Sequence, residues 1–75
     1  MKELVETIVK ALVDAPDQVV VTEQVSEKGV LLTLQVAQSD IGKVIGKQGK
    51  VANAIRSVVK AAGIRKGVHV MVNIE

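Results

Sequence analysis

The sequence predicts an α+β fold in which three helices cover one face of a three-stranded sheet. Two patterns carry this prediction. Apolar residues recur every three or four positions near the N-terminus and again after residue 50, which is the spacing of amphipathic helices. They alternate with polar residues in two central segments and near the C-terminus, which is the spacing of half-buried strands. Because the chain has only 75 residues, all these apolar faces must share one small core.

The first helix is expected from Leu4 to about Ala15. Pro16 disfavours helical geometry at the residue before it, so the helix should end there. The apolar stripe of this helix consists of Leu4, Val5, Ile8, Val9, Leu12 and Val13.

An antiparallel hairpin is expected next, with strands at 19–25 and 30–36. Ser26–Gly29 should form the turn, since glycine accepts a positive φ. The residues expected on the buried face are Val19, Val21 and Val25 in the first strand and Val30, Leu32, Leu34 and Val36 in the second.

The second half should contain a short helix at 41–45 capped by Ser39 or Asp40, a longer helix ending at Gly63, and a last strand at 68–74. The long helix should bury the stripe Val51, Ala54, Ile55, Val58 and Ala62. The resulting order is α-β-β-α-α-β. No repeat or linker interrupts it, so residues 1–75 are interpreted as a single domain.

The segment Ile41–Lys50 is the most informative part of the chain. Gly46 and Gly49 bracket a Lys-Gln pair, Gly42 precedes them, and the interleaved lysines are Lys43, Lys47 and Lys50. Glycine lets a ligand approach the backbone closely, and backbone N–H groups at the start of a helix attract anions. The segment therefore predicts a phosphate-facing loop. A tight turn between helices would explain one glycine, but not three glycines together with three lysines.

Charge is distributed unevenly along the chain. The net charge is only +2, but residues 1–39 carry three basic and six acidic groups, whereas residues 40–67 carry seven basic groups and one acid. The basic groups are Lys43, Lys47, Lys50, Arg56, Lys60, Arg65 and Lys66. Such an excess around a glycine loop favours a polyanion as the ligand over a merely solvated surface.

An Ile-Gly-x-x-Gly turn between two helices, in this order of elements, resembles a type II KH domain. With Asp14–Asp17 after the first helix and Asp40–Lys50 before the long helix, the whole chain is similar to the KhpA family of small stand-alone bacterial KH proteins. The resemblance implies one KH domain with its GXXG loop at 46–49. It also implies binding of single-stranded RNA, in which the loop holds the backbone and the bases lie in an aliphatic groove.

Carried over to this sequence, Gly46 and Gly49 would allow close approach, while Lys47 and Gln48 would touch phosphate and sugar. The other expected RNA-binding residues are Lys43, Lys50, Ile45, Ala54, Arg65 and Lys66. The groove walls are expected to be Ile45, Val51 or Ala54, and the start of the last strand at Val68 and Val70.

The resemblance further implies RNA chaperone activity, and a homodimer or a heterodimer with a protein like KhpB, also called EloR or Jag. The complex would act in post-transcriptional control of cell elongation, division and peptidoglycan homeostasis. A cytoplasmic location is expected, since no secretory signal or membrane span is apparent. The alternative is a protein-interaction adaptor with little RNA binding of its own, which would use the open sheet face with Val20, Leu31 and Met71.

Neither an enzyme nor a cofactor is expected. Gly42–Lys47 lacks the spacing and the Ser or Thr of a P-loop, and His69, the only histidine, has no titratable partner nearby in sequence. Without cysteine, the chain has no thiolate metal site. The absence of Phe, Tyr and Trp weighs against modules that stack bases on aromatic rings. It also implies weak binding by a single copy.

Overall fold

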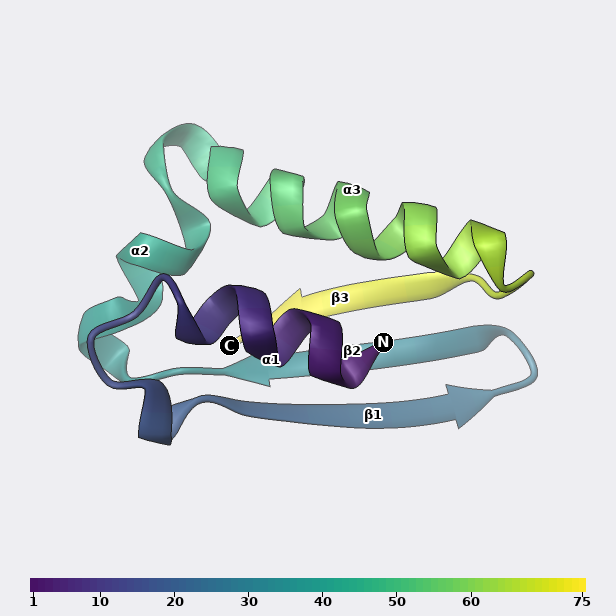
Figure 1. Cartoon of the computed structure of the whole chain (residues 1–75), viewed down its shortest axis with the longest axis horizontal. Coiled ribbons are helices and arrows are strands. Elements are labelled where there is room, and N and C mark those ends of the chain that lie inside the picture. Colours follow the sequence, from purple (N-terminus) through teal and green to yellow (C-terminus); the bar gives the residue numbers. More distant parts are fainter.

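The computed structural model describes all residues from 1 to 75. Its elements, in chain order, are α1 (Lys2–Lys10), β1 (Val20–Ser26), β2 (Gly29–Gln35), α2 (Ile41–Ile45), α3 (Lys50–Arg65) and β3 (Val70–Ile74) (Figure 1). Single 3₁₀ turns occupy Pro16–Gln18, Gln38–Asp40 and Lys47–Gly49. The predicted α+β class and the predicted order of elements are confirmed.

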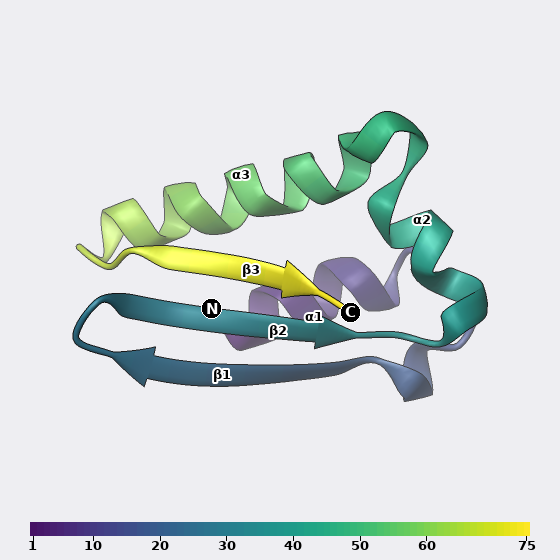
Figure 2. The same ribbon diagram turned by 180° about the vertical axis from the view of Figure 1, so that it is seen from behind.

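The three strands form one mixed sheet in the order β1-β2-β3. β1 and β2 pair antiparallel, with Val21 opposite Leu34, which confirms the hairpin. β3 pairs parallel with β2, with Val72 beside Leu32. The chain reaches this parallel position through α2 and α3, since parallel neighbours need a crossover connection. Seen from behind, the sheet stands in front of α1, and α3 runs alongside β3, which is an edge strand (Figure 2).

The core is aliphatic throughout. Its side chains come from both layers and are Val5, Val9, Val21, Leu32, Leu34, Val44, Ile55, Val59 and Val70. Burial of each such side chain stabilises the fold by roughly 1.5–3 kcal/mol. α2 contributes only Val44 to this core, so this short helix depends on further contacts for its orientation.

α1 is shorter than predicted. It ends at Lys10 rather than near Ala15. A turn follows, in which two successive N–H groups bond to the carbonyl of Val9. This turn brings the backbone of residues 14 and 15 against Asp40. α1 thus ends well before Pro16, and the residues just before Pro16 are held by a long-range contact.

The prediction for the buried face of the hairpin is wrong at one residue. Val21, Leu32 and Leu34 are buried, but Val25 is 74% exposed. The reason is visible in Figure 1, where the tip of the hairpin extends beyond α1.

α3 is rotated relative to the predicted stripe. Of the expected residues only Ile55 is fully buried, whereas Ala54 and Val58 are exposed. The buried residues of α3 are Ala52, Ile55, Val59 and Gly63. The helix has two adjacent apolar stripes, and the sheet takes only one of them.

Gly63 does not end α3, which continues to Arg65. A Cβ at Gly63 would lie 2.7 Å from the carbonyl oxygen of Val68 and 2.7 Å from the side chain of Val70. Gly63 therefore allows close packing of α3 on the start of β3. The glycine that ends the helix is Gly67, which has a φ of 71° and follows the last turn.

None of the helices has both the length and the apolar character required to cross a bilayer.

Candidate functional site

The loop between α2 and α3 is built on positive φ angles. Gly46 has φ 76° and ψ 175°, Gln48 has φ 58° and ψ 26°, and Gly49 has φ 76° and ψ 12°. Residues with a Cβ rarely adopt such angles, and Gln48 is the only one in the chain that does. The backbone reverses sharply here, with Lys47 and Gln48 exposed at its tip.

The two glycines of the loop have different surroundings. A Cβ at Gly46 would lie 2.4 Å from Cγ2 of Val51, so a side chain there would collide with the first turn of α3. A Cβ at Gly49 would have only Asn53 Nδ2 nearby, at 3.9 Å. Gly46 is therefore needed for the loop to close on α3, whereas Gly49 leaves open space for a ligand.

The tip of the loop lies at the start of α3 with its side chains exposed. Gly49 donates a backbone hydrogen bond to the carbonyl of Gly46 and Lys50 donates one to the carbonyl of Lys47, while Lys47 and Gln48 are exposed at the tip. No side chain caps the N-terminus of α3. An exposed loop tip, a helix N-terminus without a side-chain cap and the Lys47 ammonium together favour an anion as the ligand.

Asp40 does not cap α2, and neither does Ser39. The carboxylate of Asp40 instead accepts hydrogen bonds from the backbone N–H groups of Asp14, at 3.2 Å, and Ala15, at 3.1 Å. The capping prediction is therefore wrong, because a partner distant in sequence replaces the local one.

Lys43, which the sequence predicts as a phosphate contact, is held by acids. Its ammonium group pairs with the carboxylate of Asp14 and lies 3.7 Å from Oδ1 of Asp40. The hydrogen bond to Asp14 and the charges of both carboxylates raise the pKa of Lys43 above its usual value. The predicted contact between Lys43 and RNA stays a prediction, and this ion pair disfavours it.

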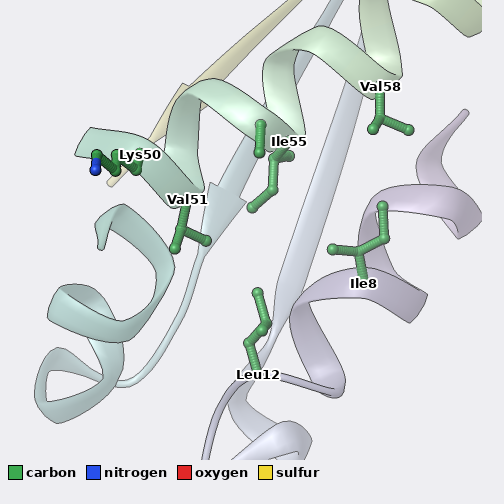
Figure 3. A pocket seen from close by; sticks show the side chains of 7 residues that line it. Ile8, Leu12, Lys50, Val51, Ile55 and Val58 are labelled. Carbon is green, nitrogen blue, oxygen red and sulfur yellow. The ribbon is translucent and has the colours of Figure 1, made fainter. Parts of the chain in front are cut away.

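The predicted groove walls lie on opposite sides of α3. On the side of α1, a hollow of about 310 Å³ is lined by Lys50 and by the apolar residues Ile8, Leu12, Val51, Ala54, Ile55 and Val58 (Figure 3). Figure 3 shows Ile8 of α1 and Leu12 of the turn that follows it facing Val51, Ile55 and Val58 of α3 across this hollow. Val68 and Val70 do not contribute to it. Ile45, at the end of α2, is partly exposed but lines neither side.

On the other side of α3, a hollow of about 350 Å³ follows the free edge of β3. Its lining residues are Arg56, Lys60, His69, Val70, Met71 and Val72. Nε of Arg56 donates a hydrogen bond to the carbonyl of Val72 at 3.3 Å. The two hollows have similar volumes, so they differ in the chemistry of the side chains that line them and not in size.

Arg56 and Lys60 are site candidates that the sequence prediction omitted. They lie one turn apart on the β3 side of α3, between the loop at one end and the exposed Arg65 and Lys66 at the other. An interval of four residues places two side chains on one helix face. The spacing alone does not identify Arg56 and Lys60 as site residues, because the sequence does not show which face of α3 packs on the sheet.

The open face of the sheet is largely uncharged. Val20 and Met71 are about half exposed there, and Leu31 lies beside Met71 in the neighbouring strand. No group of three or more His, Asp and Glu side chains that could hold a metal ion is present.

Comparison with known proteins identifies the family. A family model described as the KH domain of KhpA and KhpB matches residues 2–74. The chain belongs to the KhpA/KhpB KH-domain family. A protein named RNA-binding protein KhpA from Clostridium acetobutylicum is 54% identical over 74 residues, which are 99% of each chain. The protein of the same name from Clostridium perfringens is 55% identical over the same shares. The one from Aquifex aeolicus is 45% identical over 99% of this chain and 94% of its own.

No solved structure gives a significant match. Membership of the KhpA/KhpB family confirms the resemblance on which the KH prediction depends. The roles of the individual loop and groove residues stay predictions.

Proposed function

We propose that this KhpA/KhpB family member is a non-enzymatic protein that binds single-stranded RNA through the loop at 46–49. The observation that carries the proposal is the exposed tip of the loop, where the Lys47 ammonium and the open space at Gly49 lie at the uncapped start of α3. A phosphate bound there would meet the positive end of the helix and the Lys47 ammonium. The relatives described above carry the name RNA-binding protein KhpA, which supports RNA as the polyanion.

From the loop, the RNA is proposed to follow the β3 side of α3. Arg56 and Lys60 provide positive charge along this path, and Arg65 and Lys66 extend it to the connector. The aliphatic side chains of β3 offer apolar contact to bases, but no aromatic ring is available for stacking. Binding by one copy should therefore be weak and tolerant of sequence.

The apolar hollow on the α1 side is proposed as the place where a second copy docks. Leu12 and Val58 are 41% and 47% exposed there, so a second copy could bury further apolar surface at this place. A two-fold contact would bring the two α3 helices together along the uncharged stripe Val51, Ala54 and Val58. Two linked RNA sites would then compensate for the weakness of each one.

The wider role is a proposal that rests on the family resemblance alone. We propose an RNA chaperone that acts in the cytoplasm with a KhpB (EloR or Jag)-like partner in post-transcriptional control of cell elongation, division and peptidoglycan homeostasis. A second candidate function is a protein-interaction adaptor with little RNA binding of its own. The apolar hollow and the half-exposed Val20 and Met71 favour it.

The experiment that separates these functions changes the tip of the loop and spares its glycines. Lys47→Asp with Gln48→Asp should abolish the change in fluorescence anisotropy of a labelled single-stranded RNA. Both residues are exposed, and aspartate tolerates the positive φ at position 48. Lys2→Asp with Gln24→Asp, which makes the same change in charge at exposed positions on α1 and β1, is the control and should bind as the wild type does. Unchanged binding by the loop variant would place the RNA site elsewhere, whereas a wild type that binds no RNA would leave the adaptor as the better function.

Substituting both glycines is a poorer test. A side chain at Gly46 collides with Val51, so such a variant confuses loss of fold with loss of binding.

A further inference from the structure

Asp40 is the one charged residue that the fold buries. Its side chain is 1% exposed, and neither the proposed RNA path nor the apolar hollow uses it. Oδ1 and Oδ2 each accept one backbone hydrogen bond, from Asp14 and Ala15 respectively, and the Lys43 ammonium lies near Oδ1. A carboxylate withdrawn from water is tolerated only when its oxygens are satisfied in this way. No buried side-chain polar atom of the chain lacks a partner.

These hydrogen bonds join two parts of the chain that are 25 and 26 residues apart. One part is the turn after α1. The other is the 3₁₀ turn Gln38–Asp40, which leads directly into α2. The carboxylate of Asp40 therefore links the end of the α1 segment to α2, the helix that leads into the glycine loop.

α2 needs such a contact to fix its orientation because it is very short. It has five residues, ends where the loop begins, and places only Val44 in the core. A helix of this length has no stability of its own. Its orientation is set by what holds its ends, and Asp40 is the contact at its N-terminal end.

We propose that Asp40 is a positioning residue for the glycine loop. By holding α2 against the turn after α1, its carboxylate sets the orientation in which Lys47 and Gln48, at the tip of the loop, face the ligand. The effect on RNA affinity rests on the proposed function. The effect on the loop does not, since it is measured in the protein without RNA.

Asp40→Asn tests the proposal. The asparagine side chain has the same size as that of aspartate. Its NH2 group replaces one carboxylate oxygen, so a donor would face a backbone N–H where an acceptor stands in the wild type. The substitution also removes the negative charge of Asp40 that lies near the Lys43 ammonium. In the RNA-free protein we expect the amide NMR signals of Lys47, Gln48 and Gly49 to shift. The N–H groups of Gly46 and Gly49, both hydrogen-bonded in the wild type, should exchange with solvent faster. Affinity for single-stranded RNA should fall roughly tenfold, as expected for the loss of one charge-assisted hydrogen bond that orders the site.

Val21→Ala is the matched control. It also removes a buried group and lowers stability, but it lies on β1, and it should leave the loop signals and the affinity of the folded protein unchanged. Loop signals in Asp40→Asn that match those of the wild type overturn the proposal, whether or not the protein binds RNA. Shifted signals with unchanged RNA affinity also overturn it, provided the wild type binds. If the loop signals shift in Asp40→Asn but the wild type binds no RNA, the positioning role is supported and the proposed function is rejected.

If Asp40→Asn does not fold, Lys43→Met takes its place. Its side chain lies outside the core, and its removal takes away one of the three groups that contact the Asp40 carboxylate. The same loop signals should shift in the same direction by a smaller amount, and no shift would overturn the proposal.

Discussion

The two sides of α3 carry opposite chemistry on hollows of similar size. The side toward α1 is apolar, with Val51, Ala54 and Val58, and has a single charged residue, Lys50, at its end. The side toward the free edge of β3 carries Arg56 and Lys60. A mainly apolar hollow suits a protein partner, whereas a basic one suits a polyanion. One helix thus separates two surfaces for which we propose different functions, and the glycine loop lies at the end where both begin.

This difference shows what an amphipathic pattern does and does not say. α3 has apolar residues around more than half of its circumference, because it packs on the sheet and also lines an exposed hollow. The sequence reveals that the helix is partly buried. It does not reveal which of two neighbouring stripes faces the sheet.

Gly46→Ala should have the largest effect, because it affects both sides of α3 at once. The new Cβ would overlap Val51, which lines the apolar hollow, at a φ that disfavours alanine. We expect a loss of about 3 kcal/mol in the free energy of unfolding, measured with urea, from collision and backbone strain together. Gly49→Ala, with the same φ but open space, should lose only about 1 kcal/mol and should leave self-association unchanged. Equal losses for the two variants would contradict the distinction between these glycines.

Arg56→Gln with Lys60→Gln tests the basic side alone. Removing two cations from the proposed path should weaken binding of single-stranded RNA roughly tenfold. The slope of the logarithm of the binding constant against the logarithm of the salt concentration should become shallower by about 0.7 for each lost phosphate contact. Both quantities follow from anisotropy titrations at several salt concentrations. Ser57→Glu with Ala61→Glu makes the same change in net charge at exposed positions of the same helix and is the control. If the two double variants weakened RNA binding equally, the affinity would depend on the net charge of the protein and not on the proposed path.

Val58→Asp tests the apolar side alone. A carboxylate buried between two copies without a partner should weaken self-association at least about tenfold in sedimentation analysis. The affinity of one protomer for a short RNA should stay as in the wild type. Ser57→Asp, on the exposed neighbouring residue, is the control. Self-association that survives Val58→Asp would place the dimer contact elsewhere, for instance on the open face of the sheet.

Lys43→Met should have the smallest effect on stability, and it depends on pH. Because the pKa of Lys43 is raised above 10.5 in the folded protein, its ion pairs contribute their full stability below that pH and lose it as the pH rises through the raised value. The difference between the wild type and Lys43→Met in urea midpoints should therefore be constant at neutral pH and vanish in strong alkali. A difference that grows with pH would contradict this assignment.

Much of the fold was predictable because it depends on local periodicity. The alternation in 30–36 and the turn at Ser26–Gly29 gave the hairpin, and the bounds of α2 were predicted correctly. The glycine loop was recognisable because its spacing is itself the signal. What local patterns missed were contacts across the fold. Asp40 looks like a helix cap in sequence, yet its partners lie in the turn after α1.

The candidate site was only partly predictable for the same reason. The loop residues lie together, as expected, but Ala54 lies on the opposite side of α3 from Val70. Arg56 and Lys60 were visible as charges, but their place beside the free edge of β3 depends on the rotation of α3 and on the parallel pairing of β3. Both of these are decided by packing of the whole domain.

Gly63 has a consequence for the position of the connector between α3 and β3. With no side chain between them, α3 and the start of β3 touch at Gly63, and the two elements diverge toward the loop (Figures 1 and 2). A larger residue at position 63 would push the end of α3 away from β3. Arg65 and Lys66 would move with it, so this one glycine fixes where the far end of the proposed RNA path lies.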